Sequence, residues 1–250
     1  YTGDSVVDIL DEFSIDNDDN KNELRFPVQD IYKIGDKRVI VGRVESGKIT
    51  DEDTLLFLPT NQIVKIKSLE SWPISKKEYN KGEFVGITLD EQIFVDVGNI
   101  VSRPDNPPKL MNRFEANVFW LSQNKLQLNK KYDLKINTGQ YQVIINEIKK
   151  IIDTNDLQAK SDLKVAKNDI CELVFHSSQL IPMDNYSQIK STGRFCLLDE
   201  NEIVAGGILN LKNFPDQREV LSETKNNILP EEFYVSEIDR SVMLKHRPGI

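Results

Sequence analysis

The 250-residue chain has few of the residues on which catalytic and metal sites depend. It contains two histidines, His176 and His246, and two cysteines, Cys171 and Cys196. Two histidines are too few for a His-rich metal site, and they leave almost no candidates for a hydrolase triad. Two cysteines do not form a disulfide framework, so we expect a reducing, cytoplasmic location with both thiols buried among apolar residues.

Long apolar runs and phosphate-binding loops are missing as well. No stretch of about 18 apolar residues is present, which excludes a membrane-spanning helix and a membrane partner of that kind. Neither Gly-x-x-x-x-Gly-Lys-Ser/Thr nor Gly-x-Gly-x-x-Gly occurs, and the Gly-x-Ser-x-Gly of hydrolases is also absent. With 39% hydrophobic and 29% charged residues, the chain can still build a packed core.

Charge is distributed unevenly along the chain. The formal net charge is −8, but residues 1–24 hold eight acidic residues and one lysine, so the remainder is nearly neutral. Because no basic stripe is visible, we expect no DNA partner. The acidic stretch is predicted to be a solvated linker that follows a short amphipathic helix over Ser5–Phe13, with Asp4 as its N-cap.

From Leu24 onward the sequence consists of short extended runs separated by turn residues. β-branched residues are frequent in these runs, and the spacing of about ten residues favours a closed antiparallel barrel over alternating strands and helices. The runs predicted to be strands are Phe26–Ile34, Lys37–Ser46, Thr54–Leu58, Ile63–Glu70, Phe84–Leu89, Asn99–Arg103, Arg113–Leu121, Tyr132–Ile136, Tyr141–Ile152, Asp169–Phe175, Gly193–Asp199 and Glu202–Leu209.

The clearest domain boundary is the proline-rich segment Arg103–Pro108. Its prolines cannot donate to a strand ladder, and they hold the chain extended. Beyond the second group of strands the periodicity is lost, although Glu231–Leu244 is compatible with a short helix. The chain is therefore predicted to divide into a lead-in, two β-barrel domains and a final linker, at residues 1–23, 24–104, 105–210 and 211–250.

Few side chains could carry chemistry, and each has a structural interpretation. The carboxylates that could be paired as acid and base are predicted to be solvated residues at strand ends: Glu70, Glu83, Glu115 and Asp199. Trp72 and Trp120 could stack on a nucleic-acid base, but packing in a core or interface is the better interpretation. We therefore predict no catalytic, cofactor-binding or metal-ligating residue, and a binding or spacer module.

Four segments follow one another in a recognisable order: Arg25–Gly35, Val41–Ile49, Val64–Glu70 and Gly82–Leu89. The series resembles the second domain of translation-factor-type GTPases, the barrel that follows the nucleotide-binding domain in elongation factor Tu. The residues suit a barrel on physical grounds too, because Gly47 fits a turn with positive φ and Gly42 and Gly86 leave room for close strands. The resemblance implies an all-β chain of two consecutive antiparallel β-barrels, like domains II and III of that factor, with short helical or irregular ends.

Further segments narrow the resemblance to one branch of these GTPases. In the first barrel they are Phe26–Gln29 and Asp36–Gly47, and in the second they are Arg103–Pro108, Asn112–Ala116, Phe119–Leu121, Ile152–Leu157, Ser191–Asp199 and Ile203–Ile208. Together they are similar to the large GTPase subunit of bacterial ATP sulfurylase, a sulfate adenylyltransferase. Leu198 and Asp199 follow that branch, whereas elongation factors usually carry Arg-Asp or Arg-Glu there.

The ends of the chain extend the resemblance. Tyr1–Leu10 resembles the end of the family's GTPase domain, and Val235–Arg240 and His246–Ile250 resemble the lead-in to an adenylylsulfate kinase domain. We therefore expect a middle piece of a sulfurylase–kinase fusion that lacks both flanking domains. One departure is the turn Thr50–Thr54, where the family often has Gly-Asp, and Asp51 is predicted to shape it through its side chain.

The resemblance implies that the parent protein couples GTP hydrolysis to the formation of adenylylsulfate from ATP and sulfate. A small catalytic subunit would perform adenylyl transfer, and GTP, ATP and magnesium would bind outside this segment. The segment itself would be inactive, relaying the state of its own GTPase domain and docking the small subunit. The alternatives are tRNA-binding domains II and III of an elongation-factor-like GTPase, which the nearly neutral body disfavours, and a stand-alone binding module.

Overall fold

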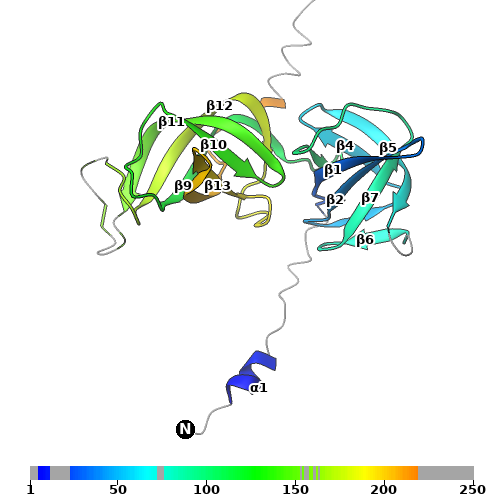
Figure 1. The fold of residues 1–250 in the computed structure, drawn as a ribbon, viewed down its shortest axis with the longest axis horizontal. Coiled ribbons are helices and arrows are strands. Elements are labelled where there is room, and N and C mark those ends of the chain that lie inside the picture. Colours follow the sequence, from blue (N-terminus) through cyan, green and yellow to red (C-terminus); the bar gives the residue numbers. More distant parts are fainter. Residues whose placement is uncertain are drawn as a thin grey trace, which may run out of the picture. The chain divides into compact units, whose positions relative to one another are not determined.

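The computed structural model describes most of the chain, namely residues 5–11, 23–71, 76–152, 154, 158–159, 162 and 164–218. The chain divides into a large unit, Tyr1–Pro215, and a second unit, Asp216–Ile250. Within the large unit the described residues form one short helix and two closed antiparallel β-barrels (Figure 1). This confirms the predicted all-β class and the two consecutive barrels.

The first barrel contains six strands in the order β1-β2-β7-β5-β4-β8. Their bounds are β1 Phe26–Ile34, β2 Lys37–Arg43, β4 Thr54–Leu58, β5 Gln62–Glu70, β7 Phe84–Leu89 and β8 Ile100–Ser102. The barrel closes because β8 pairs with both β1 and β4, so no strand is left with a free side. Its interior holds alternate apolar residues of each strand, among them Phe26, Phe57 and Ile87, all fully buried.

The second barrel also contains six strands, in the order β10-β11-β12-β9-β14-β13. Their bounds are β9 Lys109–Trp120, β10 Lys131–Ile136, β11 Gly139–Ile152, β12 Ile170–Met183, β13 Arg194–Asp199 and β14 Glu202–Asn210. The core is aromatic: the rings of Phe114 and Phe175 stack at 5.1 Å, and Phe195 meets Phe175 edge-on at 5.7 Å. The segment Arg103–Pro108 lies between β8 and β9, as its prolines lead one to expect.

A small two-stranded sheet accompanies the first barrel and was not predicted from the sequence. It pairs β3, Lys48–Thr50, with β6, Glu78–Asn80. Three-residue strands are too short to show alternation. The turn after β3 also differs from expectation, because Asp53 rather than Asp51 shapes it: the Thr50 N–H donates to Asp53 Oδ2 at 2.8 Å, and Arg103 Nε donates to Asp53 Oδ1 at 3.0 Å.

The glycine predictions are confirmed at three positions. Gly47 has a φ of +68°, and a Cβ there would lie 2.9 Å from backbone atoms of Glu23. A Cβ on Gly42 would come within 2.4 Å of the Pro27 carbonyl oxygen, and one on Gly86 within 2.6 Å of Val39. These residues have no side chain because the barrel leaves no space for one.

The predicted N-terminal helix is present as α1, Val6–Asp11, with the Ile9 N–H donating to the Ser5 carbonyl at 3.1 Å. The described residues contain no helix with the length and apolar character that a bilayer-spanning segment requires. Several sequence predictions concern residues outside the described part of the chain: the Asp4 cap, most of the acidic linker, Trp72, most of the final linker with its Glu231–Leu244 helix, and His246.

Candidate functional site at the junction of the barrels

The two barrels are joined by a buried ion pair between residues 159 positions apart in the sequence. Arg25, just before β1, donates from Nε to both carboxylate oxygens of Asp184, at 3.1 and 2.8 Å, and from Nη2 to Oδ1 at 2.8 Å. Asp184 follows β12 of the second barrel. Arg25 is 2% exposed and Asp184 5% exposed, so the pair is shielded from water.

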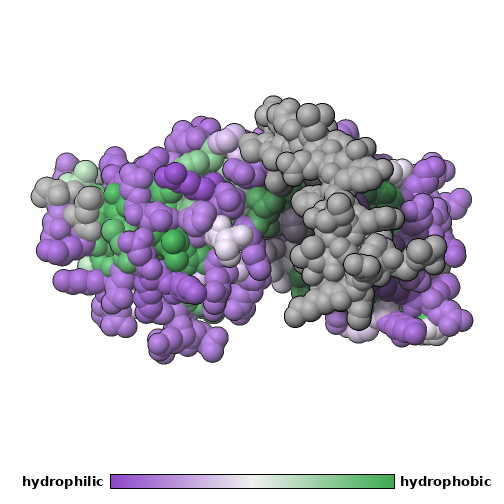
Figure 2. Space-filling view, turned by 90° about the horizontal axis from the view of Figure 1, so that it is seen from above, coloured by the Kyte–Doolittle hydropathy of each residue, from purple (hydrophilic) through white to green (hydrophobic). Residues whose placement is uncertain are grey.

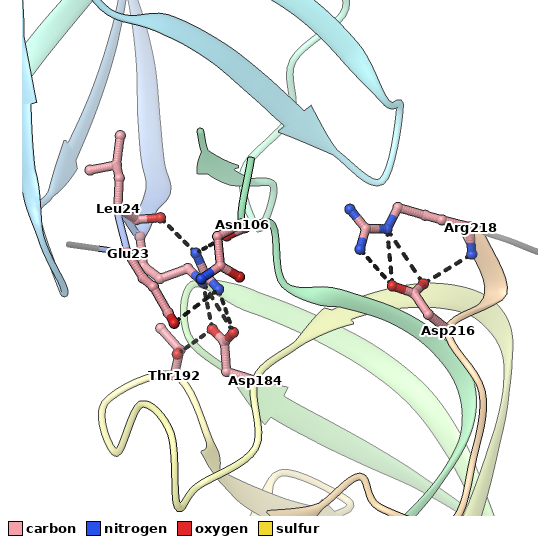
Figure 3. A network of polar contacts seen from close by, with 8 residues as sticks. Glu23, Leu24, Asn106, Asp184, Thr192, Asp216 and Arg218 are labelled. Atoms are coloured by element: carbon pink, nitrogen blue, oxygen red, sulfur yellow. Dashed lines mark hydrogen bonds and ion pairs between the residues drawn. The ribbon is translucent and has the colours of Figure 1, made fainter. Parts of the chain in front are cut away.

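The remaining polar atoms of this pair are satisfied from both barrels. Arg25 Nη1 donates to the carbonyl oxygens of Leu24, at 2.9 Å, and Asn106, at 2.8 Å. The fully buried Thr192 donates its hydroxyl to Asp184 Oδ2 at 2.6 Å. In Figure 3 the dashed lines from Leu24, Asn106 and Asp184 meet at one group, which is the guanidinium of Arg25. A buried ion pair with this many hydrogen bonds fixes direction as well as distance, so it specifies one arrangement of the barrels.

A second contact lies where the β10–β11 hairpin meets the turn before β8. A Cβ built on Gly98 would lie 2.9 Å from Gly139 Cα, and the Tyr141 hydroxyl donates to the Gly98 carbonyl at 3.2 Å. Burial raises the pKa of Tyr141 to about 12, so the phenol remains a donor. This contact between backbones fixes the hairpin turn Asn137–Thr138 at the edge of the junction.

A polar cleft of about 420 Å³ opens beside this turn, with walls from both barrels. The first barrel contributes Pro27, Gln29, Arg43 and Glu45, and the second contributes Lys135, Asn137, Thr138, Ser191, Arg194, Phe195 and Cys196. The Ser191 hydroxyl crosses between them and donates to the Glu45 carbonyl at 3.3 Å. Three cationic side chains thus face one carboxylate in a chain whose net charge is −8.

One of the four carboxylates singled out in the sequence is not at a solvated strand end. Glu115 lies within β9 and is fully buried, accepting at Oε2 from Lys149 Nζ at 2.6 Å and from Asn213 Nδ2 at 2.8 Å. The prediction was wrong because an outward-facing residue is here covered by a neighbouring lysine and by the segment after β14. The sequence pattern gives the face of a strand but not what covers it.

Glu115 interacts with a second acid, Glu172 of β12. Burial alone would raise the pKa of Glu115, but hydrogen bonds from Glu172, Lys149 and Asn213 outweigh it and hold the pKa below its usual value. The hydrogen bond with Glu115 raises the pKa of Glu172. Glu115 Oε1 is buried without a hydrogen-bond partner among the described residues. This cluster lies within one barrel and has the character of a structural support.

The other three carboxylates form partly exposed ion pairs, and they do not converge on one site. Glu70 pairs with Lys37 at 3.1 Å, Glu83 with Lys76 at 2.6 Å and Asp199 with Lys130 at 2.6 Å. No group of three or more His, Cys, Asp or Glu side chains that could hold a metal ion is found in the described part of the chain.

The prediction for Trp120 is confirmed. It is 1% exposed in the second core, donates from Nε1 to the Asn124 carbonyl at 2.8 Å and meets Tyr132 edge-on. The prediction that both thiols are buried holds for Cys171 only, because Cys196 is exposed on the outer face of β13. On the face drawn in Figure 2, hydrophilic residues dominate the coloured surface, with apolar residues in smaller groups.

The junction is not evident from the sequence. Arg25 opens a segment that carried the family resemblance, yet nothing in the sequence links it to Asp184 or Thr192, which belong to the other domain. Pairing across domains depends on how the barrels are oriented, and strand periodicity contains no information on that orientation. The only local signal is an arginine directly before a strand that begins with apolar Phe26.

The second barrel and the fold as a whole both resemble known proteins. Residues 113–210 match the family described as GTP-eEF1A C-terminal domain-like. A solved structure titled as a crystal structure analysis of sup35 complexed with GDP superposes with a TM-score of 0.73 over 86% of this chain and 53% of that chain, at 19% identity. At that identity the superposition shows a shared fold.

The chain is also similar to curated proteins over most of its length. The chain is 30% identical over 242 residues to sulfate adenylyltransferase subunit 1 of Bacteroides fragilis, covering 93% of this chain and 51% of the relative. It is also 30% identical to the protein of that name in Bacteroides thetaiotaomicron, across 100% of this chain and 55% of the relative, and 27% identical to that of Shewanella woodyi, across 84% and 45%. These homologues confirm the resemblance to the large subunit of sulfate adenylyltransferase, and the chain spans about half the length of the curated relatives it matches.

Proposed function

We propose that this chain is the tandem-barrel segment of a GTP-coupled sulfate adenylyltransferase, the enzyme that forms adenylylsulfate from ATP and sulfate. The observation that carries the proposal is the 30% identity to two proteins named sulfate adenylyltransferase subunit 1 over nearly the whole chain. In this proposal the barrels make no bond themselves. They dock the small catalytic subunit and relay to it the state of the GTPase domain.

The junction supports a relay role. A relay needs parts that move as one body, since a flexible joint would absorb a displacement instead of passing it on. Arg25 and Asp184 hold the barrels by a buried, bidentate contact, and Gly98 and Gly139 hold them by direct backbone packing. The two contacts are separate and together resist rotation of one barrel against the other.

The cofactors of the proposed reaction belong to other parts of the enzyme. GTP and magnesium would bind to a GTPase domain, and ATP would bind to the small subunit. Two segments near the end of the sequence, Val235–Arg240 and His246–Ile250, resemble the approach to an adenylylsulfate kinase domain, and on this basis we include a kinase fusion in the proposal.

The proposal is tested by binding to the small subunit of a sulfate adenylyltransferase encoded in the same genome. We expect the 250-residue chain to co-purify with that subunit and to give a saturable calorimetric titration. We expect no heat of binding with GTP and no pyrophosphate-coupled activity from the chain alone. Absence of binding to the small subunit, together with tight and salt-sensitive binding of tRNA, would instead support the translation-factor alternative.

A further inference from the structure

The cleft between the barrels has cationic groups that no described residue neutralises. Arg43 already has polar partners within the first barrel. Its Nε donates to the Gly82 carbonyl at 3.1 Å, and its Nη1 lies 3.6 Å from Glu45 Oε1. Lys135 and Arg194 are exposed, and neither has an ion pair or a side-chain hydrogen bond with any residue that the structure describes. Their charges are therefore available to a ligand.

Strand register places these two cations together. Lys135 of β10 pairs directly with Cys196 of β13, and Arg194 lies two residues before Cys196. Side chains of a strand alternate between its faces, so Arg194 and Cys196 share the outer face, and Lys135 lies on that face as well. Lys135 and Arg194 are thus diagonal neighbours across one strand pair, close enough for both to contact a single anion.

The turn beside them adds neutral polar groups. Asn137 Nδ2 and Thr138 Oγ1 line the cleft, and both are buried without a hydrogen-bond partner among the described residues. A buried polar atom left without a partner is destabilising, so an acceptor that reaches Asn137 Nδ2 gains that bond at little further cost in desolvation. Pro27 and Phe195 supply apolar wall, and the volume of about 420 Å³ lies in the range of small-molecule sites.

We propose that this inter-barrel cleft binds a small molecule bearing a phosphate or sulfate group, with the tetrahedral oxyanion held by Lys135, Arg194 and Asn137. A tetrahedral oxyanion presents acceptor atoms in several directions, which matches an ammonium and a guanidinium from two strands and an amide from the hairpin turn. Because Arg43 and Glu45 of the first barrel form the opposite wall, such a ligand would contact both barrels. The proposal depends on the chemistry of the cleft and not on the proposed function.

The exposed Cys196 in the cleft provides a local probe, because Cys171 is buried and does not compete. We would measure the alkylation rate of Cys196 in the intact chain with iodoacetamide, a neutral reagent. The probes are sodium sulfate, sodium phosphate and ATP. The alkylation rate with each probe is compared with the rate in sodium chloride at equal ionic strength. At about ten times the dissociation constant, only about a tenth of the chain is free, so the rate should fall about tenfold.

Variants separate the site from general charge effects. Lys135→Ala and Arg194→Ala should each weaken the apparent affinity about tenfold, as expected for loss of one charge-assisted contact. Lys131→Ala, on the same strand but outside the cleft, is the matched control and should retain wild-type protection. Protection by sulfate and phosphate identifies an oxyanion site, and protection by ATP alone identifies a nucleotide site. Equal alkylation rates in all salts, or protection that survives loss of both cations, would overturn the proposal.

Discussion

Gly98 and Gly139 belong to different barrels, and their backbones lie so close that a Cβ on Gly98 would be 2.9 Å from Gly139 Cα. Gly98 also has a φ of +92°, a conformation that other residues rarely adopt. The contact brings the β10–β11 hairpin against the turn before β8, and Tyr141 completes it with a hydrogen bond to the Gly98 carbonyl. The barrels can approach this closely because neither residue has a Cβ.

Gly98→Ala is therefore expected to destabilise the chain by about 2–5 kcal/mol, combining backbone strain with overpacking at the junction. The matched control is Gly35→Ala, because Gly35 has a φ of +61° and open space around it. The free energy of unfolding of the control should fall by only about 1–2 kcal/mol, because the control introduces backbone strain alone. Urea unfolding measures both. Equal losses would mean that the contact between the glycines contributes nothing.

Removing one partner of the buried ion pair should be strongly destabilising. We expect Arg25→Ala or Asp184→Ala to lower the free energy of unfolding by about 3–5 kcal/mol, since each leaves an uncompensated buried charge. The double variant Arg25→Met with Asp184→Leu should lose much less than the sum of the single changes. Arg103→Ala, which breaks a more exposed pair with Asp53 inside the first barrel, should lose only about 1 kcal/mol. Additive losses at Arg25 and Asp184 would contradict the pairing.

Glu172→Gln should make stability less sensitive to pH. The folded-state pKa of Glu172 is raised, first by its hydrogen bond with Glu115, so its contribution is present below the ordinary carboxyl pKa of about 4.3 and is lost as pH rises through the raised value. Glutamine keeps a donor at every pH and removes the like charge. We therefore expect the variant to be more stable than the parent at pH 8, by about 0.5–1.5 kcal/mol, but not at pH 4.

The exposed Glu202→Gln on β14 serves as the control for that experiment, because it also removes one negative charge but does not belong to the Glu115 cluster. Chemical denaturation at the two pH values gives the comparison. A similar pH dependence in both variants would show that the effect comes from net charge and not from the carboxyl pair.

Cys171 should resist alkylation at pH 8 until the second barrel unfolds. It is 1% exposed, and burial, with a smaller effect of Asp169, raises the pKa of its thiol to about 12. The reactive thiolate is therefore scarce at this pH even if a reagent enters. Mass spectrometry after iodoacetamide treatment should find one modified cysteine, Cys196, in native buffer and two in urea. Rapid double labelling in native buffer would contradict the described burial.

Much of the fold was predictable because strand periodicity and turn residues are local signals. Three strands have the predicted bounds: Phe26–Ile34, Thr54–Leu58 and Phe84–Leu89. The length of β12 was underestimated because its second half, from His176 to Met183, lacks regular alternation. The short strands β3 and β6 gave no pattern to detect. Local sequence is sufficient where one strand face is apolar and the other polar.

The junction and the cleft could not be predicted in the same way. Arg25 and Asp184 read individually as surface charges, and their burial arises only when two separately folded barrels come together. Glu115 was misjudged for the same physical reason, since its cover consists of Lys149 and Asn213 from elsewhere in the chain. Contacts between elements distant in sequence require orientation, which no periodicity encodes.

Ring closure of both sheets has a consequence for recognition. Every strand of either ring has its main-chain amides and carbonyls directed to a neighbour on each side, so a foreign peptide cannot join by extending the ladder. Among the described strands, only the small ribbon of β3 and β6 keeps unpaired sides, and each is three residues long. Selectivity for any associated molecule must therefore reside in side chains and in the loops between strands.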